Sequence, residues 1–172
     1  MCFSFLFTAV ITGFVILALT GIKPASAATC TFSAAVDNDY KNPPNWDCGH
    51  VPYNGDDVYI DSNSNVTSTP LEPEVRSITV NAGYTLTVYD GASLTATSSM
   101  TVSGTLNVGT GSASTTALTI GSSGSFIVTT GVASTTSIDN AGTLTIGSGT
   151  VTSTGALRGT GAITFTAGGL LP

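Results

Sequence analysis

Charged residues are scarce in this 172-residue chain. Lys and Arg number 4, Asp and Glu number 10, and together they make up 8% of the sequence. Binding to phosphate groups needs clustered basic side chains, so nucleic acid is excluded as a partner. An anionic membrane surface is excluded on the same ground. A disordered acidic chain would need more net charge than −6, so the sequence predicts a folded domain.

Groups that carry acid–base catalysis are also few. The chain has one histidine, His50, which stands in a turn beside Pro52 and is expected to face solvent. The C-terminal half offers only Asp90, Asp139 and Arg158, which are spread far apart. Polysaccharide hydrolysis or elimination needs paired carboxylates, or a cationic base with acidic partners, on one face. We therefore expect that the chain is not an enzyme, and a polysaccharide-active β-helix enzyme is the least favoured alternative.

The N-terminal part of the chain has the pattern of an export signal. Residues 2–22 are uncharged and mostly apolar, and Lys23-Pro24 then leads into Ala25-Ser26-Ala27-Ala28. Small residues at these positions predict a signal peptide over residues 1–27, with cleavage after Ala27 or Ala28. The alternative is a retained anchor, because the apolar run is long enough to span a bilayer. Cleavage would leave a secreted or cell-surface protein without membrane contact.

Cleavage of the leader would remove Cys2 and leave Cys30 and Cys48. An even pair in an oxidising compartment predicts a disulfide, which would close a loop of about 18 residues and contribute roughly 3 kcal/mol. The alternatives are two free thiols or a metal pair. Zinc would require two further ligands, and His50 is the only histidine.

Residues 28–76 form a turn-rich segment, which we call the cap segment. Val58 and Ile60 alternate with polar residues, as in a half-buried strand, and residues 63–70 are expected to form a turn. The oxygen spacing of a calcium loop is present, which makes calcium a weakly supported cofactor. Its candidate ligands are Asp61, Asn63, Asn65 and Glu72. Val66 occupies the position where such a loop turns on glycine, so we expect no metal.

Residues 77–172 contain a repeat in which a glycine is followed by two apolar residues two positions apart. The first apolar positions are Leu86, Leu106, Phe126, Leu144 and Ile163, at steps of 20, 20, 18 and 19 residues. A near-constant step predicts an all-β, right-handed parallel β-solenoid of about five coils, preceded by the N-terminal cap segment. An antiparallel β-sandwich is the alternative.

Further residues of the repeat are assigned to strands and turns. Second apolar pairs lie between the signatures, at Leu94 with Ala96 and at Leu118 with Ile120, while Val151 stands alone. Glycines between the strands are expected to adopt positive φ in turns. These are Gly91, Gly109, Gly121, Gly147 and Gly168.

Residues 46–60 carry a motif that reads W-x-x-G-x-x-P-x-x-G-D-D-V-x-I. It resembles the opening of bacterial surface proteins built from β-strand repeats, and it is similar to the start of the extracellular domain named for its eight glycines. The resemblance implies β-helical coils, surface attachment and contact with matrix or glycans. It supplies no catalytic residues.

The sequence thus predicts a non-catalytic structural or adhesion module that contacts an extracellular glycan or surface protein, or spaces other domains. Trp46 either fills the core or, with Tyr53, contacts a sugar ring. The alternative is binding to ice or a crystal surface. It would use outward rows that include Thr85, Thr87, Thr105, Thr143, Thr145 and Thr164. Open strand edges at the C-terminal end predict either continuation in a longer protein or end-to-end self-association.

Overall fold

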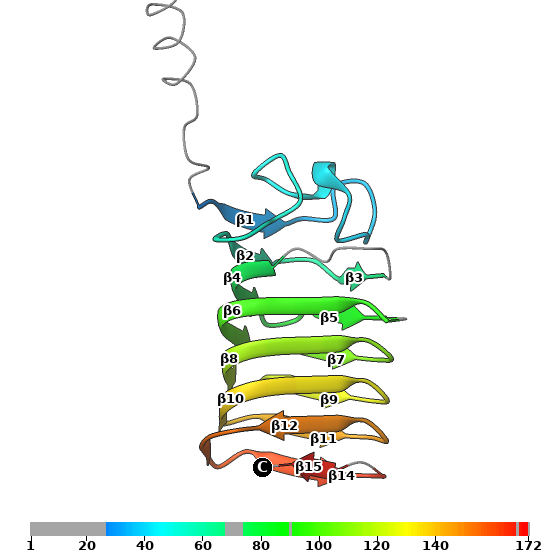
Figure 1. Ribbon diagram of the computed structural model, residues 1–172. Helices are drawn as coiled ribbons and strands as arrows, with labels where there is room; N and C mark the ends of the chain where they lie inside the picture. Colours follow the sequence, from blue (N-terminus) through cyan, green and yellow to red (C-terminus); the bar gives the residue numbers. More distant parts are fainter. Residues whose placement is uncertain (1–26, 68–73, 90, 168, 172) are drawn as a thin grey trace, which may run out of the picture.

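The computed structural model describes residues 27–67, 74–89, 91–167 and 169–171. The predicted leader up to residue 26 lies outside the described residues, as do Glu72, Asp90 and Gly168. The described chain winds into a column of stacked coils built from two parallel sheets (Figure 1). Within the described residues, no helix combines the length and the apolar character needed to span a bilayer.

The two sheets are formed by strands that alternate along the chain. The first sheet has nine strands, namely β1 (Thr29–Phe32), β2 (Asp57–Ile60), β4 (Glu74–Val80), β6 (Ser93–Val102), β8 (Ser112–Ile120), β10 (Val132–Asn140), β12 (Thr150–Ser153), β13 (Leu157–Arg158) and β15 (Gly169–Leu171). The second has six, namely β3 (Ser64–Val66), β5 (Thr85–Val88), β7 (Thr105–Val108), β9 (Ser125–Val128), β11 (Thr143–Ile146) and β14 (Ala162–Phe165).

Each strand pairs with the equivalent strand of the next coil. The pairings between these strands are parallel, and β5 meets β7 with Leu86 opposite Leu106. β7 and β9 continue this register, with Leu106 opposite Phe126. The fold is therefore the all-β parallel β-solenoid of about five coils that the repeat predicts (Figure 1). The antiparallel sandwich is wrong.

The long strands of the nine-stranded sheet turn a corner at mid-strand. In β8 the buried side chains are Ala113 before the corner and Leu118 and Ile120 after it, so the alternation changes phase. The last coil shows the same corner as a break, because β10 pairs with β12 through its first half and with β13 through its second half. Each coil therefore presents three faces around one core.

The core consists of columns of apolar side chains that stack from coil to coil. The predicted column is correct for Leu86, Leu106, Phe126 and Leu144, all of which are buried. Burying an apolar side chain of this size contributes about 1.5–3 kcal/mol. Ile163 lies in the same column opposite Leu144, but it is 36% exposed because β14 is the last strand of its sheet.

The prediction about turn glycines is wrong for most of the positions named. Of those the structure describes, Gly91 has a positive φ, whereas Gly109, Gly121 and Gly147 do not. At Gly147 the reason for glycine is space, because a Cβ atom there would lie 2.4 Å from Thr129 O on the preceding coil. Close stacking of successive backbones, rather than left-handed turns, selects glycine here.

The cap segment covers the N-terminal edge of both sheets. Beside β1, Phe32 forms an antiparallel bridge with Trp46, which follows the 3₁₀ helix η1 (Pro43–Asn45). Beside β3, Asp39 forms a parallel bridge with Asn65. β2 also pairs with β4, which spans the predicted boundary between residues 76 and 77. The change in composition therefore falls within the stacked sheet, and the cap segment includes the first coil.

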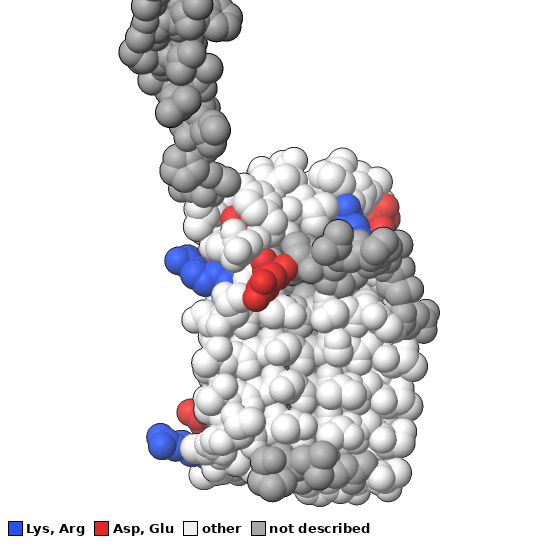
Figure 2. Space-filling model, in the orientation of Figure 1, with Lys and Arg blue, Asp and Glu red and all other residues white. Residues whose placement is uncertain are grey.

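Charge is concentrated at the cap end of the molecule. Figure 2 shows basic and acidic side chains gathered there, above coils whose visible surface is almost free of charge. From residue 91 onward the only charged side chains in the sequence are Asp139 and Arg158, which cancel. Serine and threonine therefore dominate the polar surface of the coils.

Candidate functional site

A groove runs along the corner between the two halves of the long strands. We call it the corner groove. It has a volume of about 410 Å³ and is lined by hydroxyl side chains from successive coils, with Glu74 among its other residues. These hydroxyl residues are Thr95, Thr97, Ser114, Thr115, Thr116, Ser134, Thr135, Thr136 and Thr154.

The parallel register aligns these hydroxyls in rows along the rod. Thr95 is opposite Ser114, and Ser114 is opposite Ser134, so one side chain follows another at each coil step of about 4.8 Å. Ser114 and Ser134 are exposed. The groove therefore offers hydroxyl donors and acceptors at a regular spacing.

Several groove hydroxyls are fixed by the backbone of the preceding coil. The Thr97 hydroxyl donates to Val75 O at 3.2 Å, and the Thr116 hydroxyl donates to Thr97 O at 2.8 Å. Thr135 points inward and donates to Ser137 O at 2.9 Å, which satisfies a hydroxyl that is 6% exposed. The bonds of Thr97 and Thr116 orient their hydroxyl oxygens, whose lone pairs can accept a hydrogen bond from a ligand.

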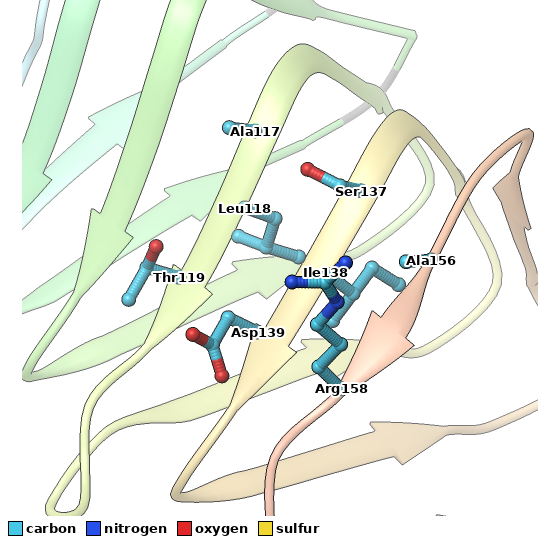
Figure 3. A pocket seen from close by; sticks show the side chains of 8 residues that line it. All are labelled: Ala117, Leu118, Thr119, Ser137, Ile138, Asp139, Ala156 and Arg158. Atoms are coloured by element: carbon cyan, nitrogen blue, oxygen red, sulfur yellow. The ribbon is translucent and has the colours of Figure 1, made fainter.

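A second groove, which we call the charged groove, lies over β8, β10 and β13 on the other side of the corner. It has a volume of about 320 Å³, and the small side chains of Ala117 and Ala156 leave room in it. Asp139 and Arg158 stand opposite each other in register. Figure 3 shows their charged ends pointing in different directions. Among the described residues no ion pair joins them, so both are available to a polar ligand.

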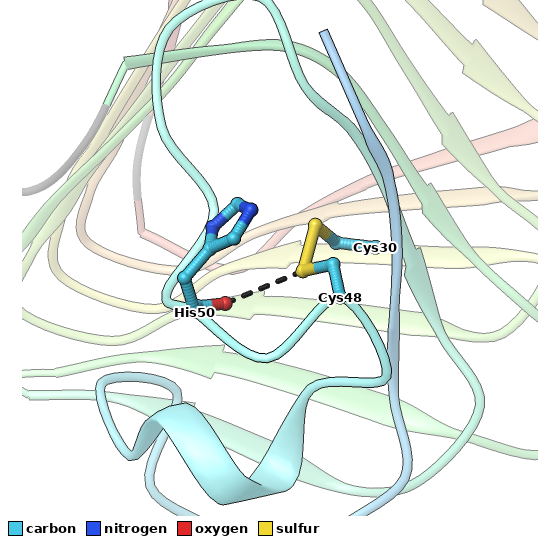
Figure 4. A group of neighbouring side chains, drawn as sticks. All are labelled: Cys30, Cys48 and His50. Atoms are coloured by element: carbon cyan, nitrogen blue, oxygen red, sulfur yellow. Dashed lines mark hydrogen bonds between the residues drawn. A yellow bond between two sulfur atoms is a disulfide. The ribbon is translucent and has the colours of Figure 1, made fainter. Parts of the chain in front are cut away.

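The disulfide predicted between Cys30 and Cys48 is present, with the two Cα atoms 5.1 Å apart. The sulfur atoms lie within 4.8 Å of a ring nitrogen of His50, and Figure 4 shows the three residues together. Metal ligation requires thiolates, which the disulfide removes. The cluster is therefore a covalent staple that joins β1 to the loop after Trp46, in agreement with the favoured sequence interpretation.

Trp46 lies in the core and Tyr53 on the surface. Trp46 is 3% exposed, its indole N–H donates to Tyr40 O at 2.7 Å, and its ring makes edge contacts with Phe32 and Tyr40. Its assignment as a glycan contact is corrected, because no ring face is free to stack on a sugar. Tyr53 is 39% exposed and packs beside His50, with ring centroids 4.9 Å apart.

The candidate calcium ligands belong to the coil rather than to a loop. The expected turn at residues 63–70 is wrong at its start, where Ser64–Val66 forms β3. The Asp61 carboxylate accepts a hydrogen bond from the Asn81 amide, and Asn63 Oδ1 accepts one from Thr85 N at 2.9 Å. These oxygens hold one coil to the next. Asn65 bridges to Asp39 through its backbone, and Glu72 lies outside the described residues.

The predicted outward rows lie on the six-stranded sheet. Thr85, Thr105 and Thr143 are half-buried and, with Ser125 between the last two, form one continuous row. The second row is less regular. Thr87 is 6% exposed, which corrects its assignment to the surface, and Asn107 and Ile127 interrupt the row before Thr145 and Thr164.

Sequence reasoning missed both grooves, although a signal for the corner groove is present. The tetrapeptide Ala-Ser-Thr-Thr occurs at residues 113–116 and again at 133–136. Its two copies stand in register on β8 and β10. Repetition of polar residues at the coil step indicates a row on the surface, as repetition of apolar residues indicates a core column. The charged groove has no such signal in the sequence, because Asp139 and Arg158 differ in type and neither recurs at the coil step.

No match was found among the curated proteins or the solved structures. The resemblance of residues 46–60 to surface proteins with β-strand repeats therefore stays a prediction. Residues 31–146 match the model of a family described as a domain of unknown function. This match covers more than half of the 172 residues and includes both the cap segment and most of the coils. The chain belongs to the DUF8693 family.

Proposed function

We propose that this chain is a non-catalytic β-solenoid module exported from the cytoplasm, and that it contacts an extracellular glycan along the corner groove. The observation that carries the proposal is the row of hydroxyls that the register aligns through Thr95, Ser114 and Ser134. A polysaccharide presents hydroxyls at regular intervals, and such a row can exchange hydrogen bonds with several sugar residues at once. Contacts that are individually weak then add along the rod.

Export is supported by the disulfide. Cys30 is fully buried, and its bond to Cys48 ties β1 to the loop after Trp46. Disulfides of this structural kind form and persist in oxidising compartments. The small residues at positions 25–28 supply a cleavage signal in the sequence. That the chain is not an enzyme remains an expectation from the scarcity of catalytic groups.

The test is glycan binding by the exported protein with its disulfide intact. We expect saturable binding to one class of polysaccharide on a glycan array. Replacing Ser114 and Ser134 together by alanine should weaken that binding at least tenfold, since each removes an exposed hydroxyl and leaves the backbone register unchanged. The matched control replaces Ser125 by alanine and Thr143 by valine on the six-stranded sheet, and it should bind as the unmodified protein does. A folded protein that binds no glycan would overturn the proposal.

One observation favours a second function, namely binding to an ordered surface such as ice. Thr85, Thr105, Ser125 and Thr143 stand in one unbroken row on parallel strands. Hydroxyls and methyls at the coil spacing can order water, although threonine is also a good exposed strand residue. The idea predicts thermal hysteresis that disappears when Thr105 and Thr143 are replaced by lysine. Absence of hysteresis in the unmodified protein would end it.

A further inference from the structure

The backbone nitrogen of Ala28 is bound by a buried carboxylate. Ala28 N donates to Asp56 Oδ1 at 2.7 Å, and Asp56 is fully buried. The second carboxylate oxygen accepts a hydrogen bond from Tyr53 N at 3.0 Å. Asp56 therefore connects the start of β1 to the turn that precedes β2.

The charge of Asp56 has little compensation from other side chains. Among the described residues, the basic group near it is His50, whose Nδ1 lies 4.0 Å from Asp56 Oδ2 and whose side chain is 37% exposed. A buried carboxylate without a cationic partner carries a desolvation cost that is not offset. A positive charge at the position of Ala28 N would offset that cost.

The sequence permits leader cleavage after Ala27 or after Ala28, and the structure distinguishes between the two. Ala28 makes two bonds, since its N–H donates to Asp56 and its C=O accepts from Asp57 N at 2.9 Å. Cleavage after Ala28 would remove both. Ala27 is exposed, and cleavage after it keeps both bonds and turns the Ala28 nitrogen into an amine.

We propose that the chain is processed between Ala27 and Ala28, and that the new α-ammonium group of Ala28 forms an ion pair with Asp56. A leader peptidase of the exporting cell would add water across the peptide bond. The C–N bond breaks, Ala27 keeps the carboxylate, and the amine of Ala28 takes up a proton at neutral pH, since the pKa of an α-amine is about 8. The donor thereby becomes charged as well as the acceptor, which adds an ion-pair attraction to the hydrogen bond that Ala28 already makes with the carboxylate. The proposal rests on the export part of the proposed function.

The first measurement is the intact mass of the exported protein. The full chain is expressed in a bacterial host that secretes it, and the mass of the product identifies its first residue. We expect a chain that begins at Ala28. A product that begins at Thr29, or one that retains the leader, would overturn the inference.

The second measurement tests the ion pair by amine labelling. Once Lys23 has left with the leader, the two amines of the protein are the α-amine of Ala28 and the Nζ of Lys41. An ion pair that raises the pKa of the α-amine by about one unit lowers its reactive, uncharged fraction about tenfold. We therefore expect the α-amine to be acylated about tenfold more slowly in the folded protein than in the reduced, unfolded protein, with an unstructured peptide amine in the same reaction as the reference.

Substitutions assign any protection to Asp56. In Asp56→Asn the protection of the α-amine should fall, whereas in Asp47→Asn it should persist. Asp47 is a matched control because its Oδ1 likewise accepts a backbone N–H, from Thr31 of β1 at 2.6 Å. If Asp56→Asn does not fold, the comparison of folded and unfolded unmodified protein still decides, and equal labelling in those two states refutes the ion pair. Failure of glycan binding would leave this result untouched.

Discussion

At the scale of single residues, the cap segment is held by buried groups with specific partners. Asn45 is fully buried and has partners at both ends of its amide. Its Oδ1 accepts from Val36 N at 2.9 Å, and its Nδ2 donates to Asp37 Oδ1 at 2.7 Å. Trp46 follows it directly and fills the space under the cap. The cap therefore depends on a few side chains rather than on repetition.

Trp46→Ala should destabilise the protein by about 3–5 kcal/mol, because it removes a buried ring and its hydrogen bond to Tyr40 O. Tyr53→Ala is the matched control on the same loop, and we expect a change of about 0.5 kcal/mol or less. Urea unfolding followed by circular dichroism measures both. A stable Trp46→Ala protein that had lost only glycan binding would restore the sugar-contact hypothesis for this residue.

The ion pair between Asp57 and Arg76 predicts acid sensitivity. Hydrogen bonding from Arg76, and to a lesser degree from Ser77, holds the pKa of Asp57 below its ordinary value of 3.8. Because the pKa is lowered by folding, the contribution to stability is present above the ordinary value and is lost as pH falls through the folded value. Asp57→Asn should therefore be less stable than the unmodified protein at neutral pH, and the difference should disappear in strong acid.

Urea unfolding at a series of pH values tests this assignment. Arg76→Gln removes the main cause of the lowered pKa and should reduce the pH dependence in the same range. An unchanged stability difference between the Asp57→Asn and unmodified proteins from neutral to strongly acidic pH would contradict it.

At the scale of elements, the signature glycines Gly104, Gly124, Gly142 and Gly161 each meet the backbone of the coil before them, whereas Gly83 in the first signature has open space and a positive φ. A Cβ atom on Gly124 would lie 2.0 Å from Val102 O, and one on Gly142 would lie 2.3 Å from Gly121 O. These contacts involve backbone atoms, which cannot move aside without shifting a coil. Glycine is therefore required at these positions because successive coils lie too close together to leave room for a Cβ atom.

Gly124→Ala should therefore destabilise the protein by about 1–3 kcal/mol or more, the usual cost of forcing atoms into a packed interior. Gly121→Ala is the matched control. It lies in the same connection, its φ is not positive, and its Cβ would sit 3.5 Å from the nearest atom, the Ser103 hydroxyl oxygen. We expect Gly121→Ala to melt close to the unmodified protein. Equal melting temperatures for the two variants would show that the coil spacing adjusts.

The repeat predicted the coils because one core column is almost purely apolar. The other faces were harder to predict. Before the corner, the inward row continues from Ala96 to Thr115, Thr135 and Ser153, so small and hydroxyl residues replace the apolar signal. Their hydroxyls donate hydrogen bonds to nearby backbone carbonyl groups. These partners are known only once the chain is folded, so the sequence does not show that such residues can be buried. The corner and its groove depend on the pairing register between strands of successive coils and on the change in inward–outward alternation along each long strand. Neither can be read from a single segment of the sequence.

At the scale of the whole molecule, the two ends of the solenoid differ. Bridges from Trp46 and Asp39 cover β1 and β3 at one end. At the other end, β14 and β15 are the last described strands of their sheets. Ile163 and Phe165 occupy inward positions on β14 but are 36% and 50% exposed. An unpaired strand edge beside exposed apolar side chains is a template for association.

The sequence-based prediction of end-to-end self-association can be tested at this open end. Sedimentation velocity over a range of concentrations should reveal reversible dimers, and Phe165→Lys should shift the protein to monomer. The control is Val36→Lys, at a side chain that is 65% exposed in the cap, and it should associate as before. A strict monomer at high concentration would contradict the prediction.

The concentration of charge at the cap has a consequence for orientation. Because the coils from residue 91 onward are neutral overall, the excess of acidic over basic side chains among the described residues lies at the cap end of the solenoid. An electric field would act mainly on the charged cap end, so it would rotate the molecule as well as move it. Close to an anionic cell envelope the cap would be repelled and the uncharged shaft would not, so the molecule would stand with its open end toward the surface. Salt would screen the repulsion between the surface and the cap. At 0.1 M salt the Debye length is about 10 Å, so the alignment would act only at separations shorter than this.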